Sequence, residues 1–203
     1  LPLPKNRLLR IPTLLFQGLF VGLSVIFNKE WPESELKIVK GRDLFMEIVK
    51  VANKKRWKVV LVGDIKESAQ KAVKVLARNY KGVKLFALSG PNLNSDGLPI
   101  DEENKETERY VIREVNKIKP QMVFVGFGAT KQEKWAYRWL PKLETFGTMV
   151  VGGTFDYVSG TTKLPPKFIE NLGFEWLWRL LTGSQKPDRI FRATIEFPLR
   201  VFW

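Results

Sequence analysis

The chain of 203 residues contains no cysteine and no histidine. These two absences exclude the Ser-His-Asp triad, the Cys-His dyad, zinc fingers, His-ligated metals and iron–sulfur clusters. Any acid or base chemistry must therefore come from Asp, Glu, Lys, Tyr or water. The lack of cysteine fits a reducing compartment, and a chain of this length can bury a core without disulfide bonds.

Acidic residues are few relative to basic ones. The chain contains 21 Asp and Glu residues but 34 Lys and Arg residues, which gives a formal charge of +13. This surplus predicts a polyanionic partner such as nucleic acid, anionic lipid or a phosphorylated substrate, although a solvated basic surface is the alternative. The C-terminal basic residues are interleaved with Trp, Phe and Leu, which suits a membrane surface at least as well as a nucleic-acid groove.

The sequence also lacks a long apolar run at its start. Residues 14–27 are apolar, but they are shorter than the ~20 residues that a membrane-spanning helix needs. No small-residue cleavage site of a signal peptide follows them. We interpret this stretch as a buried helix of the core, with a membrane-dipping segment as the alternative. Because the chain starts at Leu1 and not at Met, we expect a fragment or a processed product.

Predicted strands and helices alternate through the middle of the chain. Apolar periodicity indicates helices over residues 43–53, 67–80, 101–118 and 130–140, and strands over residues 57–62, 83–88, 122–127 and 148–151. This alternation predicts an α/β fold, a Rossmann-like parallel sheet with helices on both faces. We therefore expect three parts: a divergent N-terminal segment with an apolar helix (1–40), an α/β core (41–164) and a basic aromatic C-terminal appendage (165–203).

Spacing within the helices predicts their buried faces. The apolar residues at helical spacing are Leu44, Ile48 and Val51 in the first helix, and Ala69, Ala72, Val73 and Leu76 in the second. Asp101 is the predicted N-cap of the third helix, which begins with acidic residues that complement its dipole. In the appendage we expect two helices, over residues 168–181 and 189–203, on either side of a turn at 183–187.

Glycines follow three of the predicted strands. They are Gly63, Gly126, Gly128, Gly152 and Gly153. Right-handed crossovers bring the carboxyl ends of parallel strands to one edge of the sheet, where ligands bind in such folds. The pattern therefore predicts a ligand site at that edge; the alternative is that these glycines only make tight turns.

Residues 124–135 (FVGFGATKQEKW) pair a strand end with the start of a helix. Free backbone N–H groups at a helix start favour an anion such as a diphosphate. Lys131 adds a positive charge and Gln132 offers a donor and an acceptor, and we predict that Lys131 and Glu133 bind substrate. The glycine spacing is neither that of a Walker A loop nor that of a dinucleotide-binding fingerprint, so the motif alone is of weak specificity.

Residues 151–160 (VGGTFDYVSG) form the second motif. Gly152 and Gly153 allow close approach of a ligand to the backbone, and Thr154 and Asp156 can bond hydroxyls of a sugar or ribose. The alternative for Asp156 is that it caps the turn or helix.

The third motif is the C-terminal set of arginines and large aromatics. It comprises Arg179, Arg189, Arg192 and Arg200 with Trp176, Trp178, Phe191, Phe197 and Trp203. Guanidinium groups match phosphate oxygens, and Trp prefers the headgroup level of a bilayer. We favour membrane or phosphate contact over a helix pair whose arginines only face solvent.

A resident metal is not expected. No two Asp residues stand at the D-x-D spacing with which many nucleotide-sugar enzymes hold a divalent cation. The acidic run at residues 101–103 is better explained as the start of a helix. We therefore predict no metal and no other cofactor.

Taken in order, these stretches closely resemble the WecG/TagA/CpsF family of glycosyltransferases. The matching residues are 124–135, 151–160, 172–181 (LGFEWLWRLL) and 189–192 (RIFR), with a weaker match at 39–44 (VKGRDL). The resemblance covers roughly residues 36–203 and is divergent or truncated at the N-terminus.

The resemblance implies a metal-independent, inverting transfer of an N-acetylmannosamine-type sugar. The donor would be a UDP-sugar, and the acceptor a polyprenyl-diphosphate-linked N-acetylglucosamine at the cytoplasmic face of the bacterial plasma membrane. The products would feed teichoic acid, common antigen or exopolysaccharide synthesis. The chain would then be a peripheral membrane enzyme, and the sequence leaves a homo-oligomer open.

The family resemblance also assigns site residues. Gln132 would touch the reacting sugar or the diphosphate, and the strand-end glycines with Phe155 and Asp156 would line the UDP pocket. Arg179, Arg189 and Arg192 would meet the lipid diphosphate on the appendage, beside Trp176 and Trp178.

One family motif departs from its pattern here. The Asp of the family's Pro-Asp-Gly motif is its proposed catalytic base, but the nearest match, residues 11–14 (IPTL), has Thr13 in its place. A threonine hydroxyl cannot act as a base at neutral pH. Asp64 and Asp156 are the carboxylates left at strand ends, and the sequence assigns the role to neither.

Two other functions remain open at this point. A non-catalytic homologue that keeps its UDP-sugar or lipid affinity is motivated by Thr13. A basic nucleic-acid-binding protein is motivated by the charge, but we recognise no DNA- or RNA-binding module and expect no nucleic-acid partner.

Overall fold

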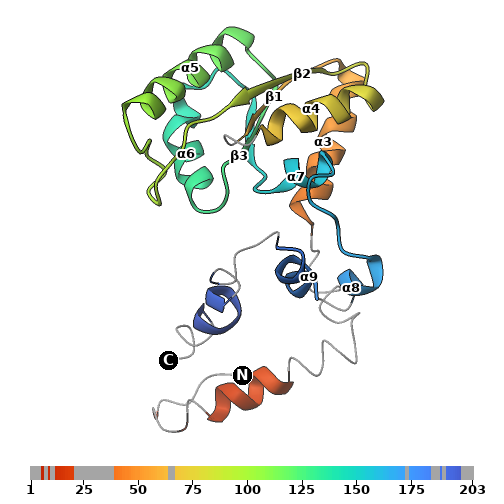
Figure 1. Cartoon of the computed structure of the whole chain (residues 1–203), viewed down its shortest axis with the longest axis vertical. Helices are drawn as coiled ribbons and strands as arrows, with labels where there is room; N and C mark the ends of the chain where they lie inside the picture. Colours follow the sequence, from red (N-terminus) through yellow and green to blue (C-terminus); the bar gives the residue numbers. More distant parts are fainter. Residues whose placement is uncertain are drawn as a thin grey trace. The chain divides into compact units, whose positions relative to one another are not determined.

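The computed structural model describes residues 6, 9, 12–20, 39–63, 67–171, 174–183, 188 and 191–197 (Figure 1). The chain divides into two compact units. One unit is Lys40–Leu164, and the other combines Leu1–Val39 with Pro165–Trp203.

Four parallel strands form the sheet of the first unit, which confirms the predicted α/β class. They are β1 (Lys58–Gly63), β2 (Lys84–Ser89), β3 (Met122–Gly126) and β4 (Gly147–Val150), in the order β2-β1-β3-β4. The central strands β1 and β3 are almost entirely buried, whereas β2 and β4 at the edges are half-buried. Continuous Val- and Leu-rich runs suit central strands because helices cover both of their faces.

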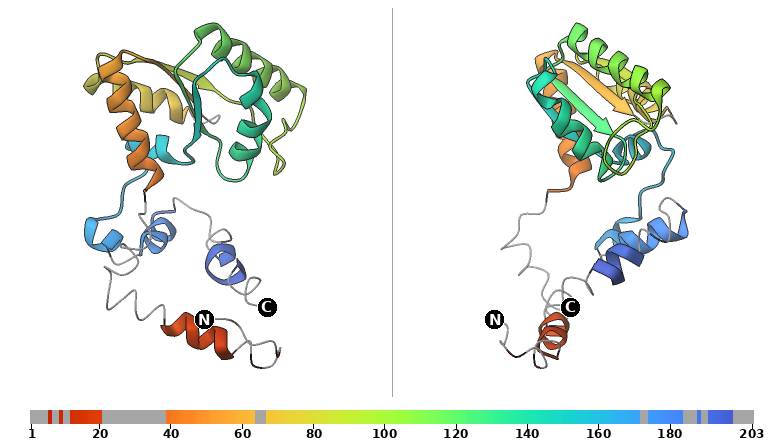
Figure 2. Two further views of the ribbon diagram at one scale, coloured as in Figure 1. Left: turned by 180° about the vertical axis from the view of Figure 1, so that it is seen from behind. Right: turned by 90° about the vertical axis from the view of Figure 1, so that its left-hand side faces the viewer.

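Helices from the same unit pack around this sheet (Figures 1 and 2). They are α3 (Gly41–Lys55), α4 (Ser68–Asn79), α5 (Glu102–Ile118), α6 (Lys131–Trp139) and α7 (Thr154–Val158), with a 3₁₀ turn η1 at Leu140–Lys142. Because successive side chains of a strand point to opposite faces of the sheet, alternate strand residues belong to two different buried clusters. One cluster joins α3, α4 and α7, and the other joins α5 and α6.

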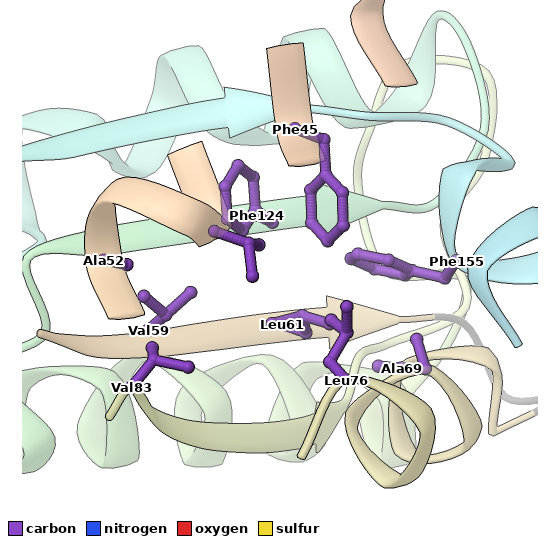
Figure 3. Close-up of a cluster of buried hydrophobic side chains, with 11 residues drawn as sticks. Phe45, Ala52, Val59, Leu61, Ala69, Leu76, Val83, Phe124 and Phe155 are labelled. Atoms are coloured by element: carbon purple, nitrogen blue, oxygen red, sulfur yellow. The ribbon is translucent and has the colours of Figure 1, made fainter. Parts of the chain in front are cut away.

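The predicted buried stripe of the first helix is wrong at two of its three positions, whereas Ile48 is partly buried and packs against the core. Leu44 and Val51 are 42% and 41% exposed, while Phe45, Val49 and Ala52 are fully buried. Figure 3 shows the cause, since the Phe45 ring points toward two other aromatic rings of the core. Its centroid lies 4.5 Å from that of Phe124 and 6.1 Å from that of Phe155, both edge-on. Burying the larger aromatic side chain rotates α3 by about one residue, or ~100°.

The other predicted faces and the cap are confirmed. Ala69, Ala72 and Leu76 of α4 are buried, and Val73 packs against the same cluster. Asp101 caps α5, because its carboxylate accepts a hydrogen bond from the backbone N–H of Asn104 at 2.8 Å. Hydrogen bonds from the backbone and the side chain of Asn104 lower the pKa of the Asp101 carboxyl.

The second unit contains short helices. The single helix predicted over residues 168–181 is instead α8 (Lys167–Asn171) and α9 (Glu175–Leu181). The N–H of Phe174 donates to the C=O of Ile169 at 3.0 Å, a bond five residues back that closes α8. Within the helix predicted over residues 189–203, the described part is helical around a π-helical turn, η2 (Arg192–Glu196). The rest of that prediction lies outside the described residues.

For the buried helix predicted over residues 14–27, the helix is confirmed in its described part, whereas its side chains are not buried within their own unit. Residues 12–20 are helical, but the side chains of Leu15, Phe16, Leu19 and Phe20 are 63–70% exposed. Both faces of the sheet are covered by helices of Lys40–Leu164. Among the residues described here, no helix is long and apolar enough to cross a membrane.

Candidate functional site

The candidate site lies where the order of the strands reverses direction. From β1 the chain moves outward to β2, and from β3 it moves outward to β4 on the opposite side. The carboxyl ends of β1 and β3 are therefore neighbours, with Gly63 paired in register with Gly126. In open parallel sheets, ligands bind outside the strands at this switch point.

Gly63 and Gly126 are required by packing. A Cβ atom at Gly63 would lie 2.7 Å from the Cβ atom of Ala69 in α4. A Cβ atom at Gly126 would lie 2.8 Å from the ring of Phe155 and 3.0 Å from the carbonyl oxygen of Gly152. Close approach of the chain to itself is enough to explain both glycines.

Gly128, Gly152 and Gly153 lie in more open surroundings. Gly128 and Gly152 have φ angles of +86° and +53°, in the region that favours glycine. A Cβ atom at Gly128 would meet no described atom within 4 Å, and at Gly152 and Gly153 the nearest atoms would be 3.9 Å away. At these three positions the backbone can be approached by a ligand.

Gln132 connects the two open loops. Its side-chain Oε1 accepts a hydrogen bond from the backbone N–H of Gly152 at 3.0 Å. Its Nε2 donates to Oε1 of Glu133 at 2.8 Å, and its own backbone N–H donates to the carbonyl of Gly128 at 3.3 Å. The residue is only 4% exposed, so this predicted catalytic residue lies beneath the surface of the site.

Helix α6 presents Lys131 and Glu133 on either side of Gln132. Glu133 is exposed and Lys131 is half-buried. The helix is held in place by Trp135, which is fully buried with its ring edge-on to Phe127 at 5.2 Å. Thr130 precedes α6 without a capping hydrogen bond from its side chain, and a helix start favours negative charge.

The second motif divides into buried and accessible residues. Thr154 is 5% exposed, and its hydroxyl donates to the carbonyl of Val151 at 2.6 Å, which holds the turn. Phe155 is 1% exposed and belongs to the core. Asp156 is half-buried and is the third residue of α7, whose N-cap position is taken by Gly153. Its Oδ2 lies 3.9 Å from where a Cβ atom of Gly153 would stand, so its carboxylate lies beside the open glycines.

The loop between β2 and α5 also borders α6. It follows β2, and Lys134 donates to the carbonyl of Ser95 at 3.1 Å and to the Asp96 carboxylate at 2.8 Å. Arg138 donates to the carbonyl of Gly97 at 2.9 Å and pairs with Glu108, which is 7% exposed. The Ser-Asp-Gly turn, with Gly97 at φ +72°, was the signal available in the sequence.

The predicted acceptor-binding residues lie in the other unit. Arg179 donates to Glu175 at 2.6 Å, and Trp176 of the same helix is 43% exposed. The Arg192 side chain is 76% exposed, with its Nε 3.9 Å from Oε2 of Glu196. Trp178 is half-buried. Arg189, Arg200 and Trp203 lie outside the described residues, as does Asp64.

Thr13 lies in the helical residues 12–20, and its hydroxyl donates to the carbonyl of Leu9 at 2.7 Å. In the part of the chain that the structure describes, no three acidic side chains gather as metal ligands.

A parallel sheet with open, glycine-lined loops at its switch point is a Rossmann-like α/β architecture, in which ligands bind outside the carboxyl ends of the strands. Residues 21–203 match the model of the "Glycosyl transferase WecG/TagA/CpsF family", so the chain belongs to that family. The resemblance proposed from the motifs is therefore confirmed.

Two similar proteins carry the name N-acetylglucosaminyldiphosphoundecaprenol N-acetyl-beta-D-mannosaminyltransferase. The relative from Bacillus subtilis (strain 168) is 29% identical over 173 residues, which is 83% of this chain and 62% of the relative. The relative from Staphylococcus aureus (strain NCTC 8325 / PS 47) is 28% identical over 152 residues, 75% of this chain and 55% of the relative. The chain thus spans less than two thirds of the length of these relatives.

Proposed function

We propose that this protein transfers an N-acetylmannosamine-type sugar from a UDP-sugar to a polyprenyl-diphosphate-linked acceptor. The observation that carries the proposal is the pair of open glycine loops at the switch point, joined by Gln132. The names of the relatives support the sugar and the acceptor class, since they describe an N-acetylmannosaminyltransferase that acts on a lipid-linked N-acetylglucosamine.

In this proposal the loops hold the nucleotide. The accessible backbone at Gly128, Gly152 and Gly153 suits close contact with the diphosphate, and Lys131 offsets its negative charge. The Asp156 carboxylate can accept hydrogen bonds from hydroxyls of the ribose or the sugar. These groups supply orientation and charge stabilisation, which suffice for a mechanism without a resident metal.

The proposed transfer is a single inverting displacement. A carboxylate takes the proton of the acceptor hydroxyl, whose oxygen forms a bond to the anomeric carbon of the donor sugar. The bond from that carbon to the UDP oxygen breaks, and UDP leaves with the electron pair. Among the described residues, Asp156 is the strand-end carboxylate beside the open glycines, and the role of base is an alternative to its contact with a donor hydroxyl.

The appendage is proposed to meet the lipid substrate at the cytoplasmic face of the bacterial plasma membrane. Trp176, Leu181 and Phe168 expose large apolar side chains, and Arg179 and Arg192 belong to the same unit. Aromatic side chains with arginines match the headgroup region and a lipid diphosphate. The product would enter synthesis of a wall teichoic acid or another surface polysaccharide.

The direct test is acceptor-dependent release of UDP from UDP-N-acetylmannosamine, with undecaprenyl-diphosphate-linked N-acetylglucosamine as acceptor. The proposal expects release that continues through many turnovers, requires the acceptor and persists in EDTA. Release that stops when the metal is removed would overturn the metal-independent mechanism.

A binding protein without turnover is the second candidate, and it is favoured by Thr13. The hydroxyl of this residue is occupied by the carbonyl of Leu9, and no carboxylate stands at that position. This candidate expects saturable UDP-sugar binding without UDP release in the same assay, so the assay separates the two functions.

A further inference from the structure

The side chain of Gln132 is buried at the site, and both ends of its amide are engaged by groups of the protein itself. The residue is 4% exposed. Its side-chain oxygen accepts a hydrogen bond from the N–H of Gly152, and its side-chain nitrogen donates one to the Glu133 carboxylate. A backbone N–H can face only the oxygen of the amide, and a carboxylate can face only its NH₂ group. The Gly152 N–H and the Glu133 carboxylate therefore both require the same orientation of the Gln132 amide.

We propose that Gln132 is a positioning residue, which places the Gly152 loop and the Glu133 carboxylate for the donor and does not itself bind the reacting sugar. Its backbone N–H adds a bond to the carbonyl of Gly128, so one residue links the loop after β3, the loop after β4 and the first turn of α6. The ligand part of this inference rests on the proposed function, whereas the link between the loops does not.

Packing makes this link a rigid one. Gln132 lies on α6, whose position is fixed by the buried Trp135. Gly152 follows β4, and its carbonyl oxygen lies against Gly126. Gly152 has a positive φ angle and no side chain, so the hydrogen bond that its N–H donates to the buried Gln132 oxygen can select one conformation of the loop.

Glu133 is the group that this arrangement presents to a ligand. It is exposed, and one of its carboxylate oxygens, Oε1, is held by Gln132. A carboxylate with one oxygen held in this way can accept a hydrogen bond from a substrate hydroxyl or amide through the other oxygen. The structure thus points to Glu133, beside Gln132, as the substrate-facing member of the pair.

The test separates positioning from direct contact by measuring the free protein first. In Gln132→Ala, hydrogen exchange at the Gly152 amide should accelerate about fivefold, the factor that corresponds to a hydrogen bond of about 1 kcal/mol. Gln132→Glu combined with Glu133→Gln keeps both an acceptor for that N–H and a donor for this acceptor, and should leave the Gly152 exchange near the wild-type rate. An unchanged Gly152 rate in Gln132→Ala would overturn the proposed link.

The matched control is Gln121→Ala at the opposite end of the sheet. Gln121 also accepts a backbone N–H, that of Lys58 at 2.7 Å. Its loss should accelerate exchange at Lys58 and leave Gly152 unchanged. A response at Gly152 in this control would show a general loosening of the fold and would overturn a specific role for Gln132.

The ligand readout uses an exchange of the two side chains. Gln132→Glu alone sets two carboxylates against each other and should weaken UDP binding at least tenfold. Adding Glu133→Gln restores a donor and an acceptor in reversed order, keeps the acceptor for Gly152, leaves an amide oxygen at position 133 to accept from the substrate, and should recover most of the affinity. A direct contact made by the Gln132 amide predicts no recovery, and that result would overturn the positioning role.

These outcomes are distinct from failure of the proposed function. If the wild-type protein releases no UDP, the exchange rates at Gly152 still decide whether Gln132 links the loops. If turnover is present and Gly152 does not respond to Gln132→Ala, the positioning role alone is contradicted.

Discussion

Glycine serves two different purposes at the carboxyl edge of this sheet. Gly63 and Gly126 stand where helices approach the strand ends within contact distance of an added methyl group, whereas Gly128, Gly152 and Gly153 leave backbone open. The residue type is the same, and only the neighbours that the fold supplies distinguish the two groups. At the scale of the residue, substitution by alanine should therefore affect stability at one group and ligand binding at the other.

Gly126→Ala should destabilise the fold by about 1–3 kcal/mol, because its methyl group would press on the buried Phe155 ring. Gly153→Ala should change the free energy of unfolding by less than about 0.5 kcal/mol, since its φ is −78° and its methyl group would meet only ordinary contacts. Urea unfolding measures both values. The assignment fails if the two variants lose equal stability, or if Gly153→Ala binds UDP as tightly as the wild type.

At the scale of the element, α5 and α6 are tied together by a charge pair that also holds the loop after β2. Glu108 is 7% exposed and pairs with Arg138, which donates to the carbonyl of Gly97. Removing Glu108 leaves a partly buried guanidinium without its carboxylate partner, which is more costly than losing a surface pair.

Glu108→Ala should therefore lower the free energy of unfolding by about 1–3 kcal/mol. The control on the same helix is Glu106→Ala, which removes an exposed pair with Arg109 and should cost less than about 0.5 kcal/mol. Urea titrations of both variants check the difference. Equal losses would mean that the Glu108–Arg138 pair contributes no more than a surface pair.

The cap of α5 predicts a pH dependence. Because hydrogen bonds from Asn104 lower the pKa of the folded Asp101 carboxyl, its stabilising contribution is complete above the unfolded pKa of about 3.9. The contribution is lost as the pH falls through the lower folded pKa. The melting temperature of Asp101→Ala should lie below that of the wild type at pH 7, and the gap should narrow as the pH falls below about 4. A gap that is constant across this range would contradict the cap.

Elements differ in how far the sequence determines them. Buried runs of Val and Leu were enough to predict β1 and β3, and the faces of α4 followed from its spacing. The buried face of α3 did not follow from its spacing. Two sets of apolar residues in this helix have helical spacing, one being Leu44, Ile48 and Val51, and the other Phe45, Val49 and Ala52. The choice depends on Phe124 and Phe155, which come from elements far along the chain.

The position of the candidate site in the fold was also predictable from the order of strands and helices. Its glycines and Asp156 could be assigned to strand ends because parallel strands share an edge. The bond from the Gly152 N–H to Gln132 could not be predicted, because it joins residues twenty positions apart through a side chain. The loop held by Lys134 and Arg138 was missed because long basic side chains on a helix give no sign of the carbonyls they reach.

At the scale of the whole molecule, the charge of +13 is shared between the α/β unit Lys40–Leu164 and a second unit rich in exposed apolar side chains. The peripheral enzyme that we propose, with a lipid-linked acceptor, would need both attraction to anionic headgroups and apolar contact with the bilayer.

Leu181→Glu, at a side chain that is 75% exposed on α9, should reduce sedimentation with phosphatidylglycerol vesicles several-fold. Phe146→Glu is the control, since that side chain is 88% exposed in the other unit and precedes β4. Deletion after Leu164 should abolish the binding. Full binding after this deletion would contradict a role of the appendage. It would instead favour membrane contact by residues 14–27, the membrane-dipping segment that is the alternative interpretation of that apolar stretch.

The central claim is that the open glycine loops at the switch point hold the donor nucleotide. It is tested most directly by titrating the ¹⁵N-labelled protein with UDP and following the backbone amide signals. The account predicts that the largest shifts occur at Gly128, Gly152 and Gly153, with little change at Gly82 and Gly147, which precede β2 and open β4 at the other end of the strands. Saturable UDP binding that leaves the three loop glycines unchanged would contradict it.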